Sequence, residues 1–229
     1  MPCCLVRLLK VRAEFVRSAA GPADYPAEGL AELAIVGRSN VGKSTLVNAL
    51  ARQRLARISA APGKTRLLNL YRVSAEPQAP FYLVDLPGYG YTGGGSAAAG
   101  TFETLTREYF ERRVAGAAPS GGGRAPAAFA VLLLVDGRHP GLENDRQAHE
   151  WLASLGVPLG VAATKIDKLS RAERSRAQHA LGQAFTSPVL PVSAVTGEGL
   201  KDLWRLIARL LSSSPRPPNR KKKSSTSPP

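Results

Sequence analysis

The sequence predicts an α/β fold built on a mostly parallel, six-stranded sheet with helices on both faces. Apolar segments that suit buried strands alternate along the chain with segments whose apolar residues recur at helical spacing. This order builds parallel sheets that are covered on both sides. The chain has 229 residues, of which 44% are hydrophobic, so it is long enough for one well-buried domain with tails.

Strands and helices are expected in alternation along the chain. The expected strands lie at 33–36, 67–73, 81–84, 128–135, 159–163 and 189–192. The expected helices lie between or after them, at 43–52, 101–114, 144–155, 171–184 and 200–211. In the last helix Leu200, Leu203 and Ile207 recur at helical spacing, so this helix should pack on the sheet.

The composition divides the chain into three parts. We expect an N-terminal extension at 1–29, one domain at 30–211 and a tail at 212–229. The tail is rich in Ser, Pro and Lys and lacks the apolar residues needed to order itself, so we expect it to be disordered. Two Gly-rich stretches inside the domain, 93–100 and 115–127, are expected to be mobile insertions.

The chain is strongly basic, with a net charge of +14. The tail holds Arg216, Arg220 and the lysines at 221–223 without an acidic residue, and the rest of the chain is basic as well. This surplus suggests a polyanionic partner, either RNA or an anionic membrane. A general bias of composition toward Arg would produce the same charge.

Cysteine and hydropathy patterns indicate a reducing compartment. Cys3 and Cys4 are adjacent, so they cannot join distant segments or supply a spaced metal site. The longest apolar run, 125–135, is interrupted by Pro126 and is too short to span a bilayer. Glu14 argues against an N-terminal transit peptide. We therefore expect a cytoplasmic protein without a membrane span or secretory signal.

Residues 37–45, Gly-Arg-Ser-Asn-Val-Gly-Lys-Ser-Thr, form a phosphate-binding motif directly after the first expected strand. Gly37 and Gly42 frame a turn whose backbone amides can point at phosphate oxygens. Lys43 supplies a positive charge for the outer phosphates, and Ser44 supplies a hydroxyl for Mg²⁺. The motif therefore predicts a site for a nucleoside triphosphate.

Further motifs at the carboxyl ends of expected strands favour GTP over ATP. In the Asp-Leu-Pro-Gly motif at 85–88, Asp85 can hold Mg²⁺ through a water and the Gly88 amide can reach the γ-phosphate. The Thr-Lys-Ile-Asp motif at 164–167 matches a guanine-reading motif, whose last carboxylate accepts hydrogen bonds that adenine cannot donate. Residues 193–194 follow the last strand, where a backbone amide can meet the guanine carbonyl.

Taken together, the motifs resemble those of the EngB family of bacterial ribosome-assembly GTPases, a branch of the translation-factor-related GTPases. The matching segments are 13–16, 37–45, 62–65, 85–91, 136–139, 164–167 and 203–204. The resemblance implies a P-loop GTPase of Ras-like fold that uses Mg²⁺ and works as a monomer. It also implies a switch in assembly of the large ribosomal subunit, and so a role in growth, septation and cell division. The implied partners are GTP and the large subunit or its precursor rRNA, with neither DNA nor a membrane.

The resemblance further implies which residues form the site. Lys43, Thr65 and Gly88 are the expected catalytic residues, and Ser44, Thr65 and Asp85 are the expected Mg²⁺ ligands. The residues expected to contact GTP or GDP are Gly37, Arg38, Ser39, Asn40, Val41, Gly42, Lys43, Ser44, Thr45, Gly63, Lys64, Thr65, Arg66, Leu67, Asp85, Leu86, Pro87, Gly88, Thr164, Lys165, Ile166, Asp167, Ser193, Ala194 and Val195.

Tyr89 occupies the position where many GTPases carry a glutamine that orients the attacking water. A phenol does not replace an amide that both donates and accepts toward that water. We therefore expect slow intrinsic turnover that a partner or a monovalent cation raises. Asn40 resembles the potassium-coordinating asparagine of related GTPases, which makes K⁺ the expected cation.

Other functions remain open on the sequence alone. The main alternative is a nucleotide-gated rRNA-binding module in which hydrolysis is incidental, and Tyr89 favours it. Cations in or beside switch I, Arg52, Arg54, Arg57, Lys64 and Arg66, either sense RNA in the GTP state or form a solvated basic loop. The absent membrane span disfavours the GTPase domain of a transporter, and the 164–167 motif disfavours an ATP-using kinase.

Overall fold

The computed structural model describes residues 10–56, 67–89, 95–117, 120 and 122–213. Its strands are β1 (Val11–Ala19), β2 (Ala31–Gly37), β3 (Leu68–Ala75), β4 (Gln78–Asp85), β5 (Phe129–Asp136), β6 (Leu159–Thr164) and β7 (Val189–Pro191). Its helices are α1 (Lys43–Ala51), α2 (Gly95–Val114), α3 (Glu143–Ser154), α4 (Arg171–Ala184) and α5 (Leu200–Ser213), with short 3-10 turns η1 (Pro22–Asp24) and η2 (Ile166–Lys168). Every strand and helix expected from the sequence is present, with shifted ends.

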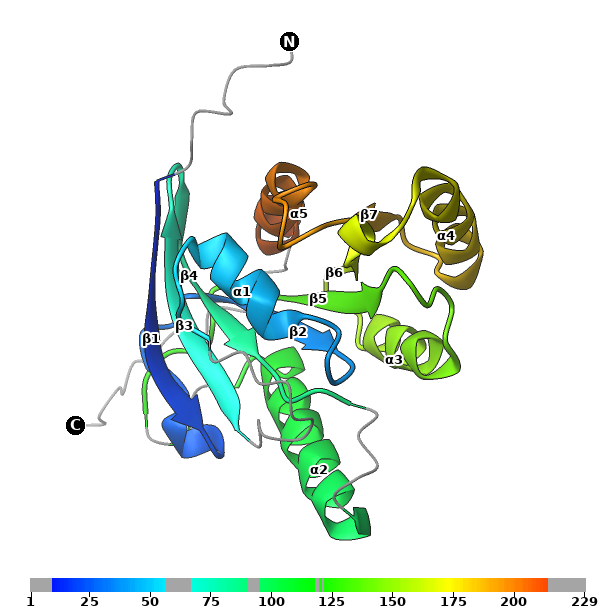
Figure 1. The fold of residues 1–229 in the computed structure, drawn as a ribbon. Coiled ribbons are helices and arrows are strands. Elements are labelled where there is room, and N and C mark those ends of the chain that lie inside the picture. The colour runs from blue at the N-terminus through cyan, green and yellow to red at the C-terminus, as the bar shows by residue number, and fades with distance from the viewer. Residues whose placement is uncertain (1–9, 57–66, 90–94, 118–119, 121, 214–229) are drawn as a thin grey trace, which may run out of the picture.

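The strands form one sheet in the order β1-β3-β4-β2-β5-β6-β7 (Figure 1). β2 is parallel to both β4 and β5, and β6 and β7 continue the parallel part. β3 pairs antiparallel with β1 on one side and β4 on the other. The prediction of a mostly parallel α/β fold is therefore confirmed.

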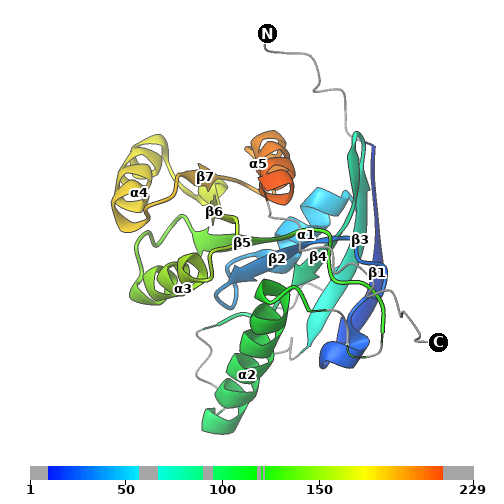
Figure 2. The same cartoon turned by 180° about the vertical axis from the view of Figure 1, so that it is seen from behind.

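Helices cover both faces of the sheet, as the reverse view shows (Figure 2). Alternate residues of β2 point to opposite sides: Leu33 and Ile35 pack with α1 and α5, whereas Ala34 and Val36 lie in the core that α2, α3 and α4 cover. Both cores contain fully buried strand residues, which accounts for the continuous apolar runs of the parallel strands. Each helix in the described part of the chain is too short or too polar to cross a membrane.

β1 is a seventh strand that the sequence analysis missed, since it assigned residues 1–29 to an extension and expected six strands. The reason is a register shift between Phe15 and Arg17. Before the shift, the odd-numbered residues Val11 and Ala13 pack against the α1/α5 core, and after it the odd-numbered Ala19 is buried in the opposite core. The bulge therefore interrupts the alternation of apolar and polar residues by which an edge strand is recognised.

The Gly-rich stretches also differ from the expectation. Helix α2 was predicted to start at residue 101 but begins at Gly95, so most of the stretch 93–100 is helical. The run of alanines at 97–99 explains this, because alanine has the highest intrinsic helix propensity. In the second stretch, the backbone amides of Arg124 and Ala127 donate to the carbonyls of Ala27 (3.0 Å) and Gly29 (2.9 Å), which attaches this part to the segment before β2.

A buried ion pair joins α2 to the sheet. The Arg113 Nε of α2 donates to Glu32 Oε2 of β2 over 2.7 Å, and the Tyr109 hydroxyl donates to the same oxygen over 2.8 Å. The guanidinium carbon of Arg113 also lies 4.6 Å from the ring centre of Tyr25. Burial raises the pKa of Glu32 despite the opposing effect of Arg113. The two hydrogen bonds and the cation together keep an acid in the core.

Replacing Arg113 by Ala should lower the free energy of unfolding by about 3–5 kcal/mol, because it leaves the Glu32 carboxylate buried without its partner. Arg112 is the matched control: it pairs with Glu108 over 3.6 Å at the surface of the same helix. Its replacement by Ala should cost at most about 1 kcal/mol. Urea unfolding monitored by circular dichroism measures both values, and equal losses in the two variants would contradict the assigned role of the buried pair.

Candidate functional site

The motif residues meet at one edge of the sheet. β2, β4, β6 and β7 run parallel, so the segments that follow them emerge on the same side. These segments are residues 37–42, 85–89, 164–168 and 192–196. In open α/β sheets this edge is where ligands bind. Residues as far apart in the sequence as 37 and 196, 159 positions, are thereby brought to the same edge.

The loop between β2 and α1 has the backbone of a phosphate-binding loop. Asn40 and Gly42 adopt positive φ angles of 62° and 108°, which turn the chain sharply before α1 begins at Lys43. A Cβ at Gly37 would lie 2.8 Å from the Leu134 carbonyl oxygen, so only glycine fits there. The Lys43 ammonium folds back and donates to the Gly37 carbonyl over 2.8 Å and to the Arg38 carbonyl over 3.0 Å. The loop thus closes around the positive charge at the start of α1.

The end of β6 supports this loop from outside. The Thr164 hydroxyl donates to the Val41 carbonyl over 2.7 Å, and the Lys165 ammonium donates to the Asn40 carbonyl. The Lys165 side chain crosses the loop, since its Cε would lie 3.8 Å from a Cβ placed on Gly42. Lys165 itself has a positive φ of 62°. Two residues of the guanine-reading motif therefore hold the phosphate loop in shape.

Asp136, for which the sequence analysis assigned no role, orients Lys165. Its Oδ2 lies 2.9 Å from the Lys165 Nζ and 2.8 Å from the Arg138 Nη2, and its Oδ1 accepts hydrogen bonds from the Arg138 Nε and backbone amide. Burial alone would raise the pKa of Asp136, but the hydrogen bonds from Arg138 and Lys165 outweigh it and hold the pKa well below its usual range. The sequence does contain a signal for this role, because Asp136 is an acid at the end of a buried apolar strand.

Lys43 and Asp85 influence each other's ionisation at the start of α1. Burial lowers the pKa of Lys43 and raises that of Asp85, and each charge opposes the effect of burial on the other. Asp85 Oδ1 is buried and, within the described residues, has no hydrogen-bond partner. An unpaired carboxylate oxygen that interacts electrostatically with Lys43, the residue before Ser44 in α1, fits a hard cation such as Mg²⁺. The expected third ligand, Thr65, lies outside the described residues.

The glycine of the 85–88 motif lies directly on the phosphate loop. A Cβ on Gly88 would lie 2.6 Å from the Ser39 backbone nitrogen and 2.7 Å from the Lys43 Nζ, so this position also requires glycine. The Ser39 amide donates to the Tyr89 carbonyl over 3.0 Å, and the Ser39 hydroxyl donates to the Gly88 carbonyl over 3.3 Å. Residues 85–89, which we call switch II, are thus docked on the loop through the backbone of Gly88 and Tyr89.

The base-reading residues also converge. The Ser193 hydroxyl donates to Asp167 Oδ1 over 2.7 Å and accepts from the amides of Val195 (3.3 Å) and Thr196 (3.1 Å). Ser193 is fully buried, so its side chain orients Asp167, whose Oδ2 lies 3.8 Å from the Lys168 Nζ, beyond hydrogen-bond distance. Ala194 is half-buried and Val195 is exposed beside it.

Several predicted contacts are limited by burial or lie outside the structure. Val41, Leu86 and Ile166 have buried side chains, so they can reach a nucleotide only through their backbones. Pro87 is buried, Thr45 is half-buried in α1, and Leu67 is exposed just before β3. The remaining predicted switch I contacts lie outside the described residues: Gly63, Lys64, Thr65 and Arg66.

Comparison with known proteins agrees with this geometry. A family model described as a 50S ribosome-binding GTPase matches residues 32–165. A protein of Pelotomaculum thermopropionicum named "Probable GTP-binding protein EngB" is 41% identical over 209 residues, which cover 89% of this chain and 98% of that protein. The protein of the same name from Thermotoga maritima is 39% identical over 202 residues, covering 86% and 95%.

Solved structures share the fold at lower identity. A crystal structure titled as a probable GTP-binding protein engB superposes with a TM-score of 0.59 at 22% identity, covering 79% of this chain and 98% of that one. Era in complex with MgGDPNP and a segment of 16S ribosomal RNA gives a TM-score of 0.64 at 22% identity, covering 85% and 61%. Since the sequence relatives are about 40% identical over most of their length, the chain belongs to the EngB family of GTP-binding proteins and is a GTPase.

Proposed function

We propose that this GTPase is a nucleotide-dependent switch in assembly of the large ribosomal subunit, docking in its GTP form and leaving after hydrolysis. The observation that carries the switch is the contact of Gly88 with Lys43, which puts switch II where it can respond to the γ-phosphate. The description of the family model as 50S ribosome-binding supports the partner. The net charge of +14 suits rRNA.

The proposed mechanism relies on positioning and electrostatics, because phosphoryl transfer to water needs little covalent chemistry from the protein. Lys43 and the backbone amides of the loop 37–42 would bind the negative charge of the phosphates, and the Gly88 amide would meet the γ-phosphate. Ser44, Asp85 and Thr65 would hold Mg²⁺, which neutralises charge on the β- and γ-phosphates when bound. Asp167 would accept hydrogen bonds from guanine, and Ser193 keeps that carboxylate in place.

The phenol of Tyr89 bears on the rate. Its hydroxyl donates to Asp145 Oδ1 over 2.8 Å, so its proton is directed at a carboxylate of α3. A tyrosine held in this way does not orient the attacking water as a glutamine does. We therefore propose slow intrinsic turnover, which the ribosomal particle or a monovalent cation raises. The same observation favours the alternative function, an rRNA-binding module gated by nucleotide in which hydrolysis is incidental.

The base specificity can be tested with Asp167→Asn. Guanine presents two donors to the carboxylate, whereas xanthine presents a carbonyl that the asparagine amide can donate to. Because two charge-assisted hydrogen bonds are lost, the Kd for GDP should rise about 100-fold or more. Affinity for xanthosine diphosphate should rise in the same variant. Fluorescence titration with both nucleotides measures this, and a variant that still prefers GDP would contradict the role of Asp167.

Potassium dependence can be tested at Asn40, which is exposed in the phosphate loop with a φ of 62°. We expect GTP turnover to be faster in KCl than in NaCl of equal concentration. The difference should disappear in Asn40→Ala, because the side-chain oxygen would be one of the ligands of the cation. Equal rates of the unmodified protein in the two salts would remove the proposal.

The ribosomal role can be tested with purified small and large subunits on a sucrose gradient, in GDP and in a non-hydrolysable GTP analogue. We expect comigration with the large subunit in the analogue only, and this binding should survive a moderate increase in salt. GTP turnover measured with the same particles separates the two functions. Turnover that the particles stimulate supports the GTPase switch, and turnover that they do not change supports the nucleotide-gated rRNA-binding module. Binding that ignores the nucleotide would reject both.

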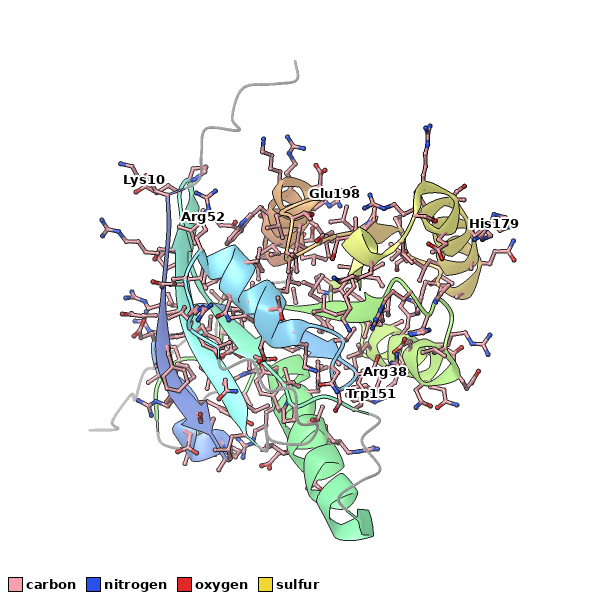
Figure 3. The ribbon with its side chains drawn as sticks, in the orientation of Figure 1. Lys10, Arg38, Arg52, Trp151, His179 and Glu198 are labelled. Atoms are coloured by element: carbon pink, nitrogen blue, oxygen red, sulfur yellow. The ribbon has the colours of Figure 1, made fainter. Side chains whose placement is uncertain are left out.

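Variants can locate the contact on the ribosome. Arg54 follows α1, whose C-terminal end lies beside β1, where the Gln53 side chain donates to the Ala13 carbonyl. Figure 3 labels Arg52 and Lys10 at this end of the molecule. Replacing Arg54 and Arg57 by Glu should weaken particle binding without changing the Kd for GDP. The same charge change at Arg171 and Arg176, which are exposed on α4, is the control.

A further inference from the structure

We infer that Asp145 is a positioning residue for the response of this GTPase to the γ-phosphate, because it ties the phosphate loop and switch II to α3. Asp145 Oδ1 accepts the Tyr89 hydroxyl hydrogen bond over 2.8 Å and lies 3.3 Å from the Arg38 Nε. The Asp145 side chain is fully buried. One carboxylate oxygen therefore contacts both the phosphate loop and switch II.

The three residues come from three separate connections of the sheet. Arg38 follows β2, Tyr89 follows β4, and Asp145 lies in the first turn of α3, which follows β5. Figure 3 shows Arg38 beside α3, far from Arg52 at the C-terminal end of α1. The backbones of Arg38 and Tyr89 also form a parallel bridge, and the Ser39 amide donates to the Tyr89 carbonyl. The side-chain contact at Asp145 thus adds to a backbone contact between the same two segments.

The charges around Asp145 determine which group donates the hydrogen bond and which accepts it. Burial raises the pKa of Asp145, whereas the Tyr89 hydrogen bond and the Arg38 charge lower it. Burial and the adjacent carboxylate raise the pKa of Tyr89, so the phenol stays a hydrogen-bond donor. The N-terminal end of α3 also favours a negative charge at Asp145. A carboxylate in this place holds a phenol and a guanidinium more firmly than an apolar residue could.

Tyr89 is the neighbour of Gly88, so a contact that holds Tyr89 also affects the position of Gly88. Gly88 lies on the Lys43 ammonium, and its neighbour Tyr89 is the residue that α3 holds. Fixing Tyr89 therefore fixes the Gly88 amide near the place where the γ-phosphate is proposed to bind. GDP has no γ-phosphate and should not sense this restraint. The inference rests on the proposed role of Gly88, and the experiment below keeps the two apart.

The test compares affinity for GDP with affinity for a non-hydrolysable GTP analogue in Tyr89→Phe, Asp145→Asn and the double variant. We expect each single variant to raise the Kd for the analogue about tenfold, the effect of losing one charge-assisted hydrogen bond, with the Kd for GDP changed less than about twofold. The losses should be less than additive in the double variant, because both changes act on the Tyr89–Asp145 hydrogen bond, while Asp145→Asn also removes the charge beside Arg38.

Two controls make the result specific. Tyr25→Phe removes another buried phenol hydroxyl, one that has no hydrogen-bond partner among the described residues, and it should change neither affinity. Gly88→Ala reports on the proposed function itself: its Cβ would lie 2.7 Å from the Lys43 Nζ, so it should weaken binding of the analogue and, through Lys43, of GDP as well. If Gly88→Ala has no effect, the proposed γ-phosphate contact fails rather than the inference about Asp145.

Three results would overturn the inference when Gly88→Ala behaves as expected. They are unchanged analogue affinity in Tyr89→Phe, equal weakening of GDP and analogue, and additive losses in the double variant. Thermal unfolding of each variant shows whether the fold is intact. Tyr89→Phe keeps the ring and its packing, so this variant decides the question even if Asp145→Asn unfolds.

Discussion

The backbone path of the loop 37–42 is the constraint on which the site depends. The chain must leave β2, turn through two positive φ angles and enter α1 within a few residues, and only a glycine fits at Gly37. This path lets the Lys43 ammonium return to the Gly37 and Arg38 carbonyls, so the positive charge sits inside the loop. The other motifs are arranged around that charge.

The loop is held by side chains from other strand ends rather than by its own hydrogen bonds alone. Thr164 and Lys165 donate to loop carbonyls after β6, while Asp136 after β5 fixes the direction of Lys165. Each donor satisfies one backbone carbonyl of the loop, that of Val41 or that of Asn40, from outside the loop. Nucleotide binding and sheet topology are therefore linked through residues that are distant in sequence.

Much of this site could be predicted from local motifs, but contacts between residues that are distant in sequence could not. The loop at 37–45, the segment 85–88 and the guanine-reading motif each act within a few residues, so their spacing predicts both their structure and their chemistry. The partners of Asp136 and Asp145 could not be predicted, because each lies on a different strand connection. An acid at the end of an apolar strand, such as Asp136, could have been recognised, but nothing local indicates that Lys165 contacts it or that Tyr89 contacts Asp145 on α3.

The fold shows the same division. Periodicity predicted the parallel strands because both of their faces are buried, whereas the bulge in β1 mixed residues of the two faces and hid an edge strand. The predicted helix α2 is too short because the glycines near its start suggested a flexible loop, although three alanines lie between them. In β1 the bulge hid the local pattern, whereas in α2 the helix propensity of alanine outweighed that of the neighbouring glycines.

The most direct test of the account is a crystal structure of the protein with Mg²⁺ and a non-hydrolysable GTP analogue. The account predicts that the loop 37–42 keeps its backbone path and that the Lys43 ammonium and the Gly88 amide both contact the γ-phosphate. It also predicts that Asp167 binds the guanine while Ser193 still donates to it. A loop that refolds around the phosphates, or a base bound away from Asp167, would contradict it.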